Sequence, residues 1–356
     1  MSLLHRLEEL AKIGATPEGG VTRRAFTPED VSGRELVVKW MEESGLEVRF
    51  DGDMNITGYR RGSEGGKAIV TGSHLDTVPN GGRFDGALGV LAGIEAVASI
   101  KNPRHQLEVI VFTDEESTMC GSKGVTANRS DDIAAFLELH VEQGPVLENT
   151  GNNLGVVTGI VGQRRFIVNF SGQANHAGTT PMDMRDDALV KASEFVMFVR
   201  RQALHFGNGL VATVGKMEVH PNAANVVADR VTLTVEFRDL DPANLDRFER
   251  VLSDRVNSMD GRMDKQYEST PVPCDPCIMW AVDKACRKFS DRVIEMPSRA
   301  SHDAQELGRR WPMGMIFVPS AQGISHNPAE YTSNADCIRG TEVLAETIQI
   351  LDNELN

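Results

Sequence analysis

The sequence predicts an α/β fold, in which a domain with helices around a mixed, largely parallel sheet is interrupted by an inserted ferredoxin-like α+β domain. Three observations predict this arrangement. The 356 residues are long for a single core. Several apolar runs of strand type end in polar side chains, as in open α/β sheets. The stretch between about 160 and 270 has a different order of elements. We therefore expect the larger domain over 1–157 and 271–356, and the insertion over 158–270.

The larger domain begins with an amphipathic helix pattern, "MSLLHRLEELAKIG", which has charges throughout and no signal-peptide core. Four apolar runs then predict buried strands that lead into His, Asp or Glu: "AIVTGSHLD", "LEVIVFTDEES", "AAFLELHVEQGP" and "MGMIFVPSAQGISH". Between the first two runs, a glycine-rich loop carries Asp85 into the helix "GALGVLAGIEAVASI". Ligands gather at the carboxyl ends of strands in such sheets, so we expect these side chains to meet.

The insertion has its own pattern of elements. A strand, a helix, two strands, a helix and a strand follow one another as "RRFIVNFSG", "MRDDALVKASEFVMFVRRQAL", "GLVATVGKMEV", "RVTLTVEFRDL", "NLDRFERVLSDRVNSM" and "RMDKQYEST". This β-α-β-β-α-β order is that of a split βαβ, ferredoxin-like domain. The larger domain resumes near "PVPCDPCIMWAVDKACRKFS".

Composition excludes several classes of partner. The formal net charge of −14 argues against nucleic acid or an anionic membrane surface. No apolar stretch approaches the roughly 20 residues that span a bilayer. The five cysteines are odd in number and scattered, which predicts a reducing cytoplasmic location. Cys274 and Cys277 form one C-x-x-C flanked by prolines, and we interpret it as a loop rather than a redox or zinc site.

Three consecutive carboxylates, Asp114 to Glu116, follow the second apolar run, where their repulsion costs stability unless a positive group lies nearby. Taken singly, the candidates have ordinary explanations, since a His after a strand is more often structural and an Asp before a helix is often an N-cap. Taken together, they supply the imidazoles and carboxylates that two divalent ions about 3.5–4 Å apart require: His74, Asp85, Glu116, His140 and His326.

Two further acids have places beside this set. Glu115 remains free to act as the general base for an attacking water. Asp76 lies two residues after His74, where its carboxylate can hold an imidazole or a neighbouring group in a fixed orientation. Imidazole and carboxylate ligands suit both zinc and manganese, so the identity of the metal stays open.

Several long motifs carry a resemblance to a known family: "GSHLDTVPNGGRFDGALGVLAG", "VFTDEES", "ELHVEQGPVLE", "GQANHAGTTPMDMRDDAL", "PNAANVVAD" and "SHNPAEYTS". They resemble the hydantoinase/carbamoylase family of allantoate, ureidoglycolate and N-carbamoyl-amino-acid amidohydrolases, within the clan of dinuclear aminoacylases and carboxypeptidases. The similarity runs over nearly the whole chain. It implies that Asp85 bridges two metal ions, that His74 and His140 complete one site, and that Glu116 and His326 complete the other.

The resemblance also implies substrate-binding residues in the insertion, namely Gln163, His176, Asn225 and Arg238. His176 is expected to reach the active site of a partner subunit and to stabilise the charge of a tetrahedral intermediate. An arginine fork suits a substrate carboxylate well. The alternative for Arg238 is a surface ion pair with Asp239 or Asp241.

Two departures from the family pattern leave the substrate open. The chain reads "SRASHDA" at residues 298–304, where Arg299 and Ser301 replace small residues. This arginine form is similar to the ureidoglycolate branch, and we place Arg299 in the substrate site. The 24-residue spacing from Glu116 to His140 is short for the family, so a helix and loop beside the site are expected to be trimmed or absent.

The sequence thus predicts a metal-dependent amidohydrolase that cleaves a linear ureido, carbamoyl or amidino C–N bond in a small carboxylate and releases ammonia. A dipeptidase or N-acyl-amino-acid hydrolase of the same clan is the alternative, although His140 within "ELHVEQGP" argues against it. A binding protein that keeps only the fold would be expected to lack ligands or base. Exposed edge strands and the resemblance together predict a homodimer through the insertion.

Overall fold

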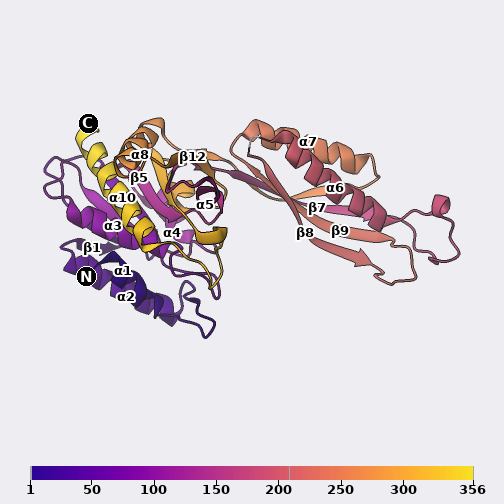
Figure 1. Cartoon of the computed structure of the whole chain (residues 1–356), viewed down its shortest axis with the longest axis horizontal. Coiled ribbons are helices and arrows are strands. Elements are labelled where there is room, and N and C mark those ends of the chain that lie inside the picture. The colour runs from indigo at the N-terminus through magenta and orange to yellow at the C-terminus, as the bar shows by residue number, and fades with distance from the viewer. Residues whose placement is uncertain (1, 208, 356) are drawn as a thin grey trace. The chain divides into compact units, whose positions relative to one another are not determined.

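The computed structural model describes residues 2–207 and 209–355. Its internal contacts divide the chain into two compact units: unit 1 runs up to Ile160 and resumes at Pro273, and unit 2 comprises Val161–Val272. The predicted fold class is confirmed, because unit 1 is built on a mixed sheet with a parallel centre and unit 2 on a separate antiparallel sheet (Figure 1).

The nine-stranded sheet has the order β1-β2-β4-β3-β5-β13-β6-β11, and β12 also pairs with β6. Its centre consists of four mutually parallel strands: β4 (Leu107–Phe112), β3 (Ala68–His74), β5 (Ile133–Val141) and β13 (Met313–Val318). The flanking strands are β1 (Glu47–Phe50), β2 (Ile56–Arg60), β6 (Leu154–Ile160), β11 (Val272–Pro273) and β12 (Val293–Ser298). Each central strand corresponds to one of the four apolar runs of the sequence, and their carboxyl ends lie at one edge.

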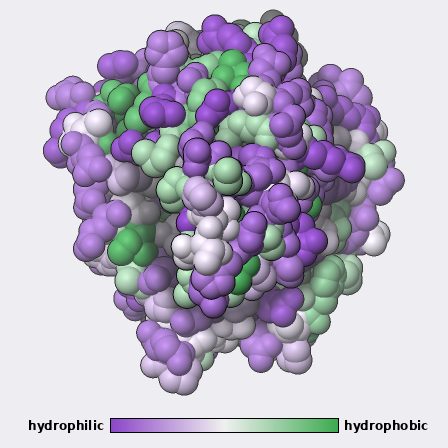
Figure 2. Space-filling model, turned by 90° about the vertical axis from the view of Figure 1, so that its right-hand side faces the viewer, coloured by the Kyte–Doolittle hydropathy of each residue, from purple (hydrophilic) through white to green (hydrophobic). Residues whose placement is uncertain are grey.

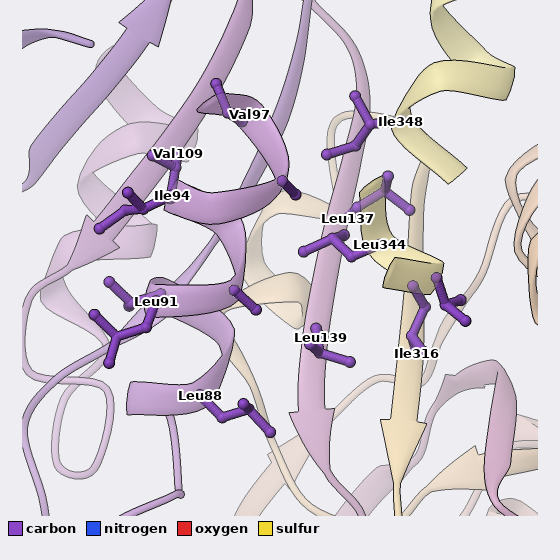
Figure 3. Packing of buried hydrophobic residues seen from close by; sticks show 14 of the residues in the cluster. Leu88, Leu91, Ile94, Val97, Val109, Leu137, Leu139, Ile316, Leu344 and Ile348 are labelled. Carbon is purple, nitrogen blue, oxygen red and sulfur yellow. The ribbon is translucent and has the colours of Figure 1, made fainter. Parts of the chain in front are cut away.

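Helices cover this sheet: α1 (Leu3–Ala11), α2 (Pro28–Glu43), α3 (Ala87–Ser99), α4 (Cys120–Asn128), α5 (Val146–Thr150), α8 (Pro276–Phe289), α9 (Asp303–Leu307) and α10 (Asn334–Glu354). Figure 3 shows Ile94 of α3 beside Val109 of β4, and Leu344 of α10 beside Leu137 of β5. Each fully buried side chain of this size stabilises the fold by about 1.5–3 kcal/mol. This core fixes α3, and therefore the loop that precedes it, against the parallel strands.

Unit 2 has the predicted β-α-β-β-α-β order: β7 (Gly162–Ser171), α6 (Ala188–Phe206), β8 (Val211–His220), β9 (Arg230–Asp239), α7 (Pro242–Asn257) and β10 (Arg262–Ser269). The antiparallel strand order β10-β7-β9-β8 is that of a ferredoxin-like sheet. Alternate side chains such as Phe166, Phe170 and Phe237 are buried beneath the two helices. The intervening residues form the other, more polar face of the sheet.

The surface is of mixed character. On the face shown in Figure 2, hydrophobic side chains form small groups separated by hydrophilic ones. None of the helices within residues 2–207 and 209–355 combines the length and apolar character needed to cross a membrane. Cys274 lies in the short connection between β11 and α8, as the predicted loop requires, whereas Cys277 is in the first turn of α8. Asp275 caps this helix by accepting hydrogen bonds from the backbone N–H groups of Cys277 and Ile278.

Candidate metal centre

The four parallel strands bring the candidate ligands together. His74 is the last residue of β3, and His140 lies one residue before the end of β5. Glu115 and Glu116 follow β4, and the loop after β13 carries His326. Strand register aligns these ends, since His74 lies opposite Phe112 of β4.

Asp85, in the loop before α3, lies between two groups of ligand atoms. Its Oδ1 atom is 3.3 Å from Nε2 of His140 and 3.6 Å from Nε2 of His74. Its Oδ2 atom is 3.4 Å from Nε2 of His326, which in turn is 3.6 Å from Oε2 of Glu116. The two sets that can each hold a cation are therefore His74–Asp85–His140 and Asp85–Glu116–His326, with Asp85 common to both.

The hydrogen bonds of the two buried imidazoles fit a cation at the first set. Nδ1 of His74 lies 2.9 Å from the backbone oxygen of Asp76, and Nδ1 of His140 lies 2.9 Å from that of Val141. Each Nδ1 therefore carries the proton, and each Nε2 directs a lone pair towards the Asp85 carboxylate. Nε2 of His140 is buried without a hydrogen-bond partner among the described residues. Two acceptors at this separation repel one another unless a proton or a cation lies between them.

The electrostatics of the cluster lead to the same conclusion. Burial alone would lower the pKa of His74, but Glu115, Asp85 and Asp76 outweigh it and raise that pKa well above the usual value. A hydrogen bond to Asp85 is the main cause that raises the pKa of His326 to about 8. The carboxylates therefore attract positive charge to the imidazole nitrogens, and a divalent cation supplies that charge in place of protons.

A third group of donor atoms consists of His140 together with Glu138 and His302. The Glu138 carboxylate accepts hydrogen bonds from the Ser73 hydroxyl at 2.8 Å and from the backbone N–H of Ala304 at 2.9 Å. His302 Nε2 lies 2.8 Å from the Ser298 hydroxyl. These hydrogen bonds occupy Glu138 and His302, and the His302 ring packs against that of His140 with 4.5 Å between the centroids, so we do not assign a cation to this group.

The carboxylate of Asp76 holds a neighbouring group rather than an imidazole, which is the second of the two roles that its spacing allowed. Its carboxylate accepts the backbone N–H groups of Glu115 and Glu116, at 3.3 Å and 3.1 Å. Its Oδ1 atom is 3.8 Å from Nδ1 of His74, beyond hydrogen-bond distance. Asp76 therefore fixes the backbone that positions Glu115 and Glu116.

Glu115 lies at the edge of the cluster, with Oε2 at 3.7 Å from Nε2 of His74. Burial is the main cause that raises the pKa of its carboxyl group well above the usual range, and the nearby acids Asp303 and Glu116 add to it. A carboxylate whose proton affinity is raised in this way is suited to accept a proton and to return it.

Three further polar residues surround Asp85 and were not singled out from the sequence. Glu330 accepts the backbone N–H groups of Phe84 and Asp85, at 3.0 Å and 3.1 Å. The Ser325 hydroxyl donates to Asp85 and to Glu330, and the Gln143 amide donates to Asp85 at 2.9 Å. All three lie within quoted motifs, "HVEQGP" and "SHNPAEYTS". Their position next to the candidate ligands was the signal that could have identified them.

The predicted substrate residues Gln163 and Arg238 lie directly opposite one another on β7 and β9 of unit 2. Cross-strand neighbours project from the same face of a sheet. Arg238 donates to Oε1 of Glu236 through two nitrogen atoms, at 2.9 Å and 2.8 Å. An ion pair of the kind weighed as the alternative is therefore present with Glu236, an acid that the sequence reasoning did not name.

His176 and Asn225 lie in two loops of unit 2 that pair with one another, since the backbone N–H of Ala177 donates to the backbone oxygen of Asn225 at 3.0 Å. The imidazole of His176 is exposed, and its Nδ1 accepts the backbone N–H groups of Gly178 and Thr179. The proton of the neutral ring must then be on Nε2, which is free to donate outwards.

Arg299 lies in unit 1, between β12 and α9, where it is half-buried. It immediately follows Ser298, whose hydroxyl donates to the backbone oxygen of Ala300 at 2.9 Å. This loop leads into His302 and the buried Asp303 at the start of α9. Arg299 thus shares a loop with residues that lie behind the candidate metal centre.

The fold and this cluster of imidazoles and carboxylates define an α/β metal-dependent hydrolase. Residues 70–350 match the model of Peptidase family M20/M25/M40, and the chain belongs to that family.

The relatives define its branch. The chain is 34% identical over 397 residues to the N-carbamoyl-L-amino acid amidohydrolase of Geobacillus stearothermophilus, with 97% of each chain covered. It is 36% identical over 386 residues to the allantoate amidohydrolase of Escherichia coli (strain K12), with 94% of each chain covered. A crystal structure of an amidase of the hydantoinase/carbamoylase family from Burkholderia multivorans matches with a TM-score of 0.93 at 36% identity, over 97% of this chain and 96% of that one. The predicted resemblance is confirmed.

Proposed function

We propose that this protein is an amidohydrolase that cleaves a linear ureido or carbamoyl C–N bond in a small carboxylate such as allantoate, ureidoglycolate or an N-carbamoyl amino acid. The position of Asp85 carries the proposal. Its two oxygen atoms face separate pairs of ligands, with His74 and His140 on one side and His326 on the other. The activities named for the two relatives give the class of substrate.

Two divalent cations, zinc or manganese, fit this donor set. His74 and His140 would hold one, Glu116 and His326 the other, and Asp85 would contact both. When bound, such cations polarise the scissile carbonyl and acidify water. The proposal draws support from the Nδ1 hydrogen bonds of His74 and His140, which leave both Nε2 lone pairs directed at Asp85.

Glu115 is proposed as the general base that takes the proton of the attacking water and later delivers a proton to the leaving nitrogen. The raised pKa of its buried carboxyl group supports this role. Asp76 acts as a positioning residue, because its carboxylate holds the backbone N–H groups of Glu115 and Glu116. The reaction on a carbamoyl substrate would then release ammonia and carbon dioxide.

Unit 2 is proposed to supply further groups to the substrate. His176 presents an Nε2–H donor, which suits the negative oxygen of a tetrahedral intermediate. Arg238 offers a guanidinium for the substrate carboxylate, with Gln163 opposite it on the next strand and Asn225 in the loop beside His176. Glu236 would orient Arg238 in this arrangement. Arg299 of unit 1 is proposed to contact the substrate as well.

A homodimer through unit 2 is part of the proposal. Strand β8 is an edge of the four-stranded sheet and is mostly exposed. Helix α6 packs over β8 and β9 and leaves Val190, Met197 and Leu204 exposed. These three residues are seven positions apart and therefore form one stripe along the helix. A two-fold partner would extend the sheet at β8 and cover this stripe.

Ammonia release from allantoate, ureidoglycolate, N-carbamoyl amino acids and dipeptides, with zinc or manganese added to the metal-depleted protein, tests the activity. We expect turnover of at least one ureido or carbamoyl compound and none of the dipeptides. Cleavage of dipeptides alone would refute the proposed bond. Metal analysis of the purified protein should give two ions per chain.

Mixing two inactive variants tests the contribution of His176 across the dimer. Exchange of Glu115→Gln chains with His176→Ala chains should restore up to about a quarter of wild-type activity, because half of the dimers are mixed and each then holds one intact site. Wild-type activity of His176→Ala alone would contradict the assignment. A location in the cytoplasm remains part of the proposal, and the five free cysteines support it.

A further inference from the structure

A cleft of about 410 Å³ opens on unit 1 next to the candidate metal centre. It shares Asp76 and Glu116 with that centre, and its other walls include Arg24, Phe26, Val78 and Pro79. None of these four residues has a role in the reaction described above. We call this cavity the Arg24 cleft.

Arg24 is the one cationic residue among those that line the cleft. Its side chain is exposed, and within residues 2–207 and 209–355 its guanidinium group makes neither an ion pair nor a hydrogen bond. Two of the three lining acids have other hydrogen-bond partners, because Asp76 accepts two backbone N–H groups and Asp114 accepts the Thr118 hydroxyl. The third, Glu116, lies 3.6 Å from Nε2 of His326. The guanidinium is therefore available to an anionic ligand.

Phe26 follows Arg24 by two residues and has a backbone conformation that is rare for a bulky side chain. Its φ angle is +66°, which is rare for a bulky residue and costs of order 1–3 kcal/mol. It occupies the third position of a turn closed by the N–H of Thr27 and the backbone oxygen of Arg24, where a positive φ usually requires Gly or Asn. Phe26 is 57% exposed, so burial of its side chain does not offset the strain.

The turn is held rigidly in this conformation. The backbone N–H of Phe26 donates to Asp30 at 3.0 Å, and the Thr27 hydroxyl donates to the backbone oxygen of Arg24 at 2.7 Å. Thr27 is also the N-cap of α2. Helix α2 therefore anchors an aromatic ring and a guanidinium side by side at the mouth of the cleft. Backbone strain kept at an exposed aromatic residue is typical of a ligand site.

We infer that the Arg24 cleft binds a second carboxylate of the substrate, so that the enzyme prefers N-carbamoyl derivatives of acidic amino acids such as aspartate. Arg24 pairs with the side-chain carboxylate, and Phe26, Val78 and Pro79 contact the short carbon chain. The first carboxylate remains the partner of Arg238. This inference rests on the proposed function, which supplies the ureido group next to Glu116.

Kinetic constants for N-carbamoyl-aspartate and N-carbamoyl-alanine, measured on wild type and Arg24→Leu, test the inference. The substitution should raise KM for the aspartate derivative about ten- to hundredfold and leave that for the alanine derivative within about twofold. Arg24→Lys should retain part of the preference. Phe26→Gly should weaken binding of the aspartate derivative while it preserves or raises the melting temperature, since it relieves the strain.

Arg292→Leu is the matched control, because Arg292 is another exposed arginine of unit 1 and lies outside the cleft, at the start of β12. Equal effects of Arg24→Leu on both substrates, or no effect on either, would overturn the inference. If neither compound is hydrolysed, ammonia release from allantoate and ureidoglycolate still decides the proposed function separately. Calorimetric binding of the same two compounds then decides the question: binding of N-carbamoyl-aspartate that is unchanged in Arg24→Leu would exclude the cleft as a carboxylate site.

Discussion

Gly86 separates Asp85 from helix α3 and leaves no room for a side chain. Its φ angle is +64°, and a Cβ atom at this position would lie 2.5 Å from both Cε1 and Nε2 of His74. Carbon atoms in favourable contact are about 3.5–4.0 Å apart, so the imidazole of Gly86→Ala would have to retreat by about 1 Å. The His74 ring cannot move away freely, because its Nδ1 is hydrogen-bonded to the backbone oxygen of Asp76.

We expect Gly86→Ala to lower metal affinity and to reduce kcat/KM by about 100-fold, since a displacement of about 1 Å is enough for a loss of this size. The backbone conformation, with φ of +64° and ψ of −50°, adds a separate cost to stability of about 1–3 kcal/mol for a residue with a side chain. The assay is metal content after dialysis at a fixed free metal concentration, followed by ammonia release and urea denaturation on the same samples.

Gly45→Ala separates the two effects. Gly45 has a φ angle of +77°, but no atom lies within 4 Å of a Cβ built there. This variant should therefore lose similar stability while it keeps wild-type metal content and activity. Full metal content and activity in Gly86→Ala, or an equal loss of activity in both variants, would refute the packing of Gly86 against His74.

Three further predictions follow from the described contacts. Glu115→Gln should lower kcat by about 10²–10⁴-fold while both metal ions stay bound, as single-turnover kinetics and metal analysis will show; normal turnover would remove Glu115 from the role of base. Glu330→Ala should weaken metal binding about 10- to 100-fold. Glu330→Gln should weaken it less, because an amide oxygen can still accept hydrogen bonds from the N–H groups of Phe84 and Asp85. Equal metal affinities of the two variants in a metal titration would contradict this. Glu108→Ala should destabilise the fold by about 3 kcal/mol in urea denaturation, since it leaves Arg49 and Arg129 without their shared buried partner.

The part of the site that the sequence predicted depends on strand ends. A strand of parallel type that stops at a His or just before Glu can be recognised locally, and parallel strands put such ends at one edge of the sheet. His74, His140 and Glu116 follow this rule. His326 lies eight residues beyond the end of β13, so the strand end alone does not place it and its prediction depended on the whole set of candidate ligands.

The contacts that could not be predicted join segments far apart in the chain. Glu330 bonds to the N–H groups of residues about 245 positions earlier, and nothing in its local sequence indicates which groups it meets. The pairing of Glu236 with Arg238 was missed for a different reason. Residues two apart on a strand project from the same face, so Glu236 is a neighbour of Arg238 whereas Asp239 faces the buried side.

In the run Asp114-Glu115-Glu116, the fold separates three consecutive carboxylates whose mutual repulsion the sequence alone does not explain. Asp114 has a φ angle of +59°, and its carboxylate accepts the Thr118 hydroxyl, which turns it away from the other two acids. The next two residues give their N–H groups to Asp76, so Glu115 lies near His74 and Glu116 near His326. Bound cations are therefore not the only means by which the repulsion between the three carboxylates is relieved. The backbone separates them first, and the remaining negative charge lies on Glu115 and Glu116, next to the candidate metal ligands His74 and His326.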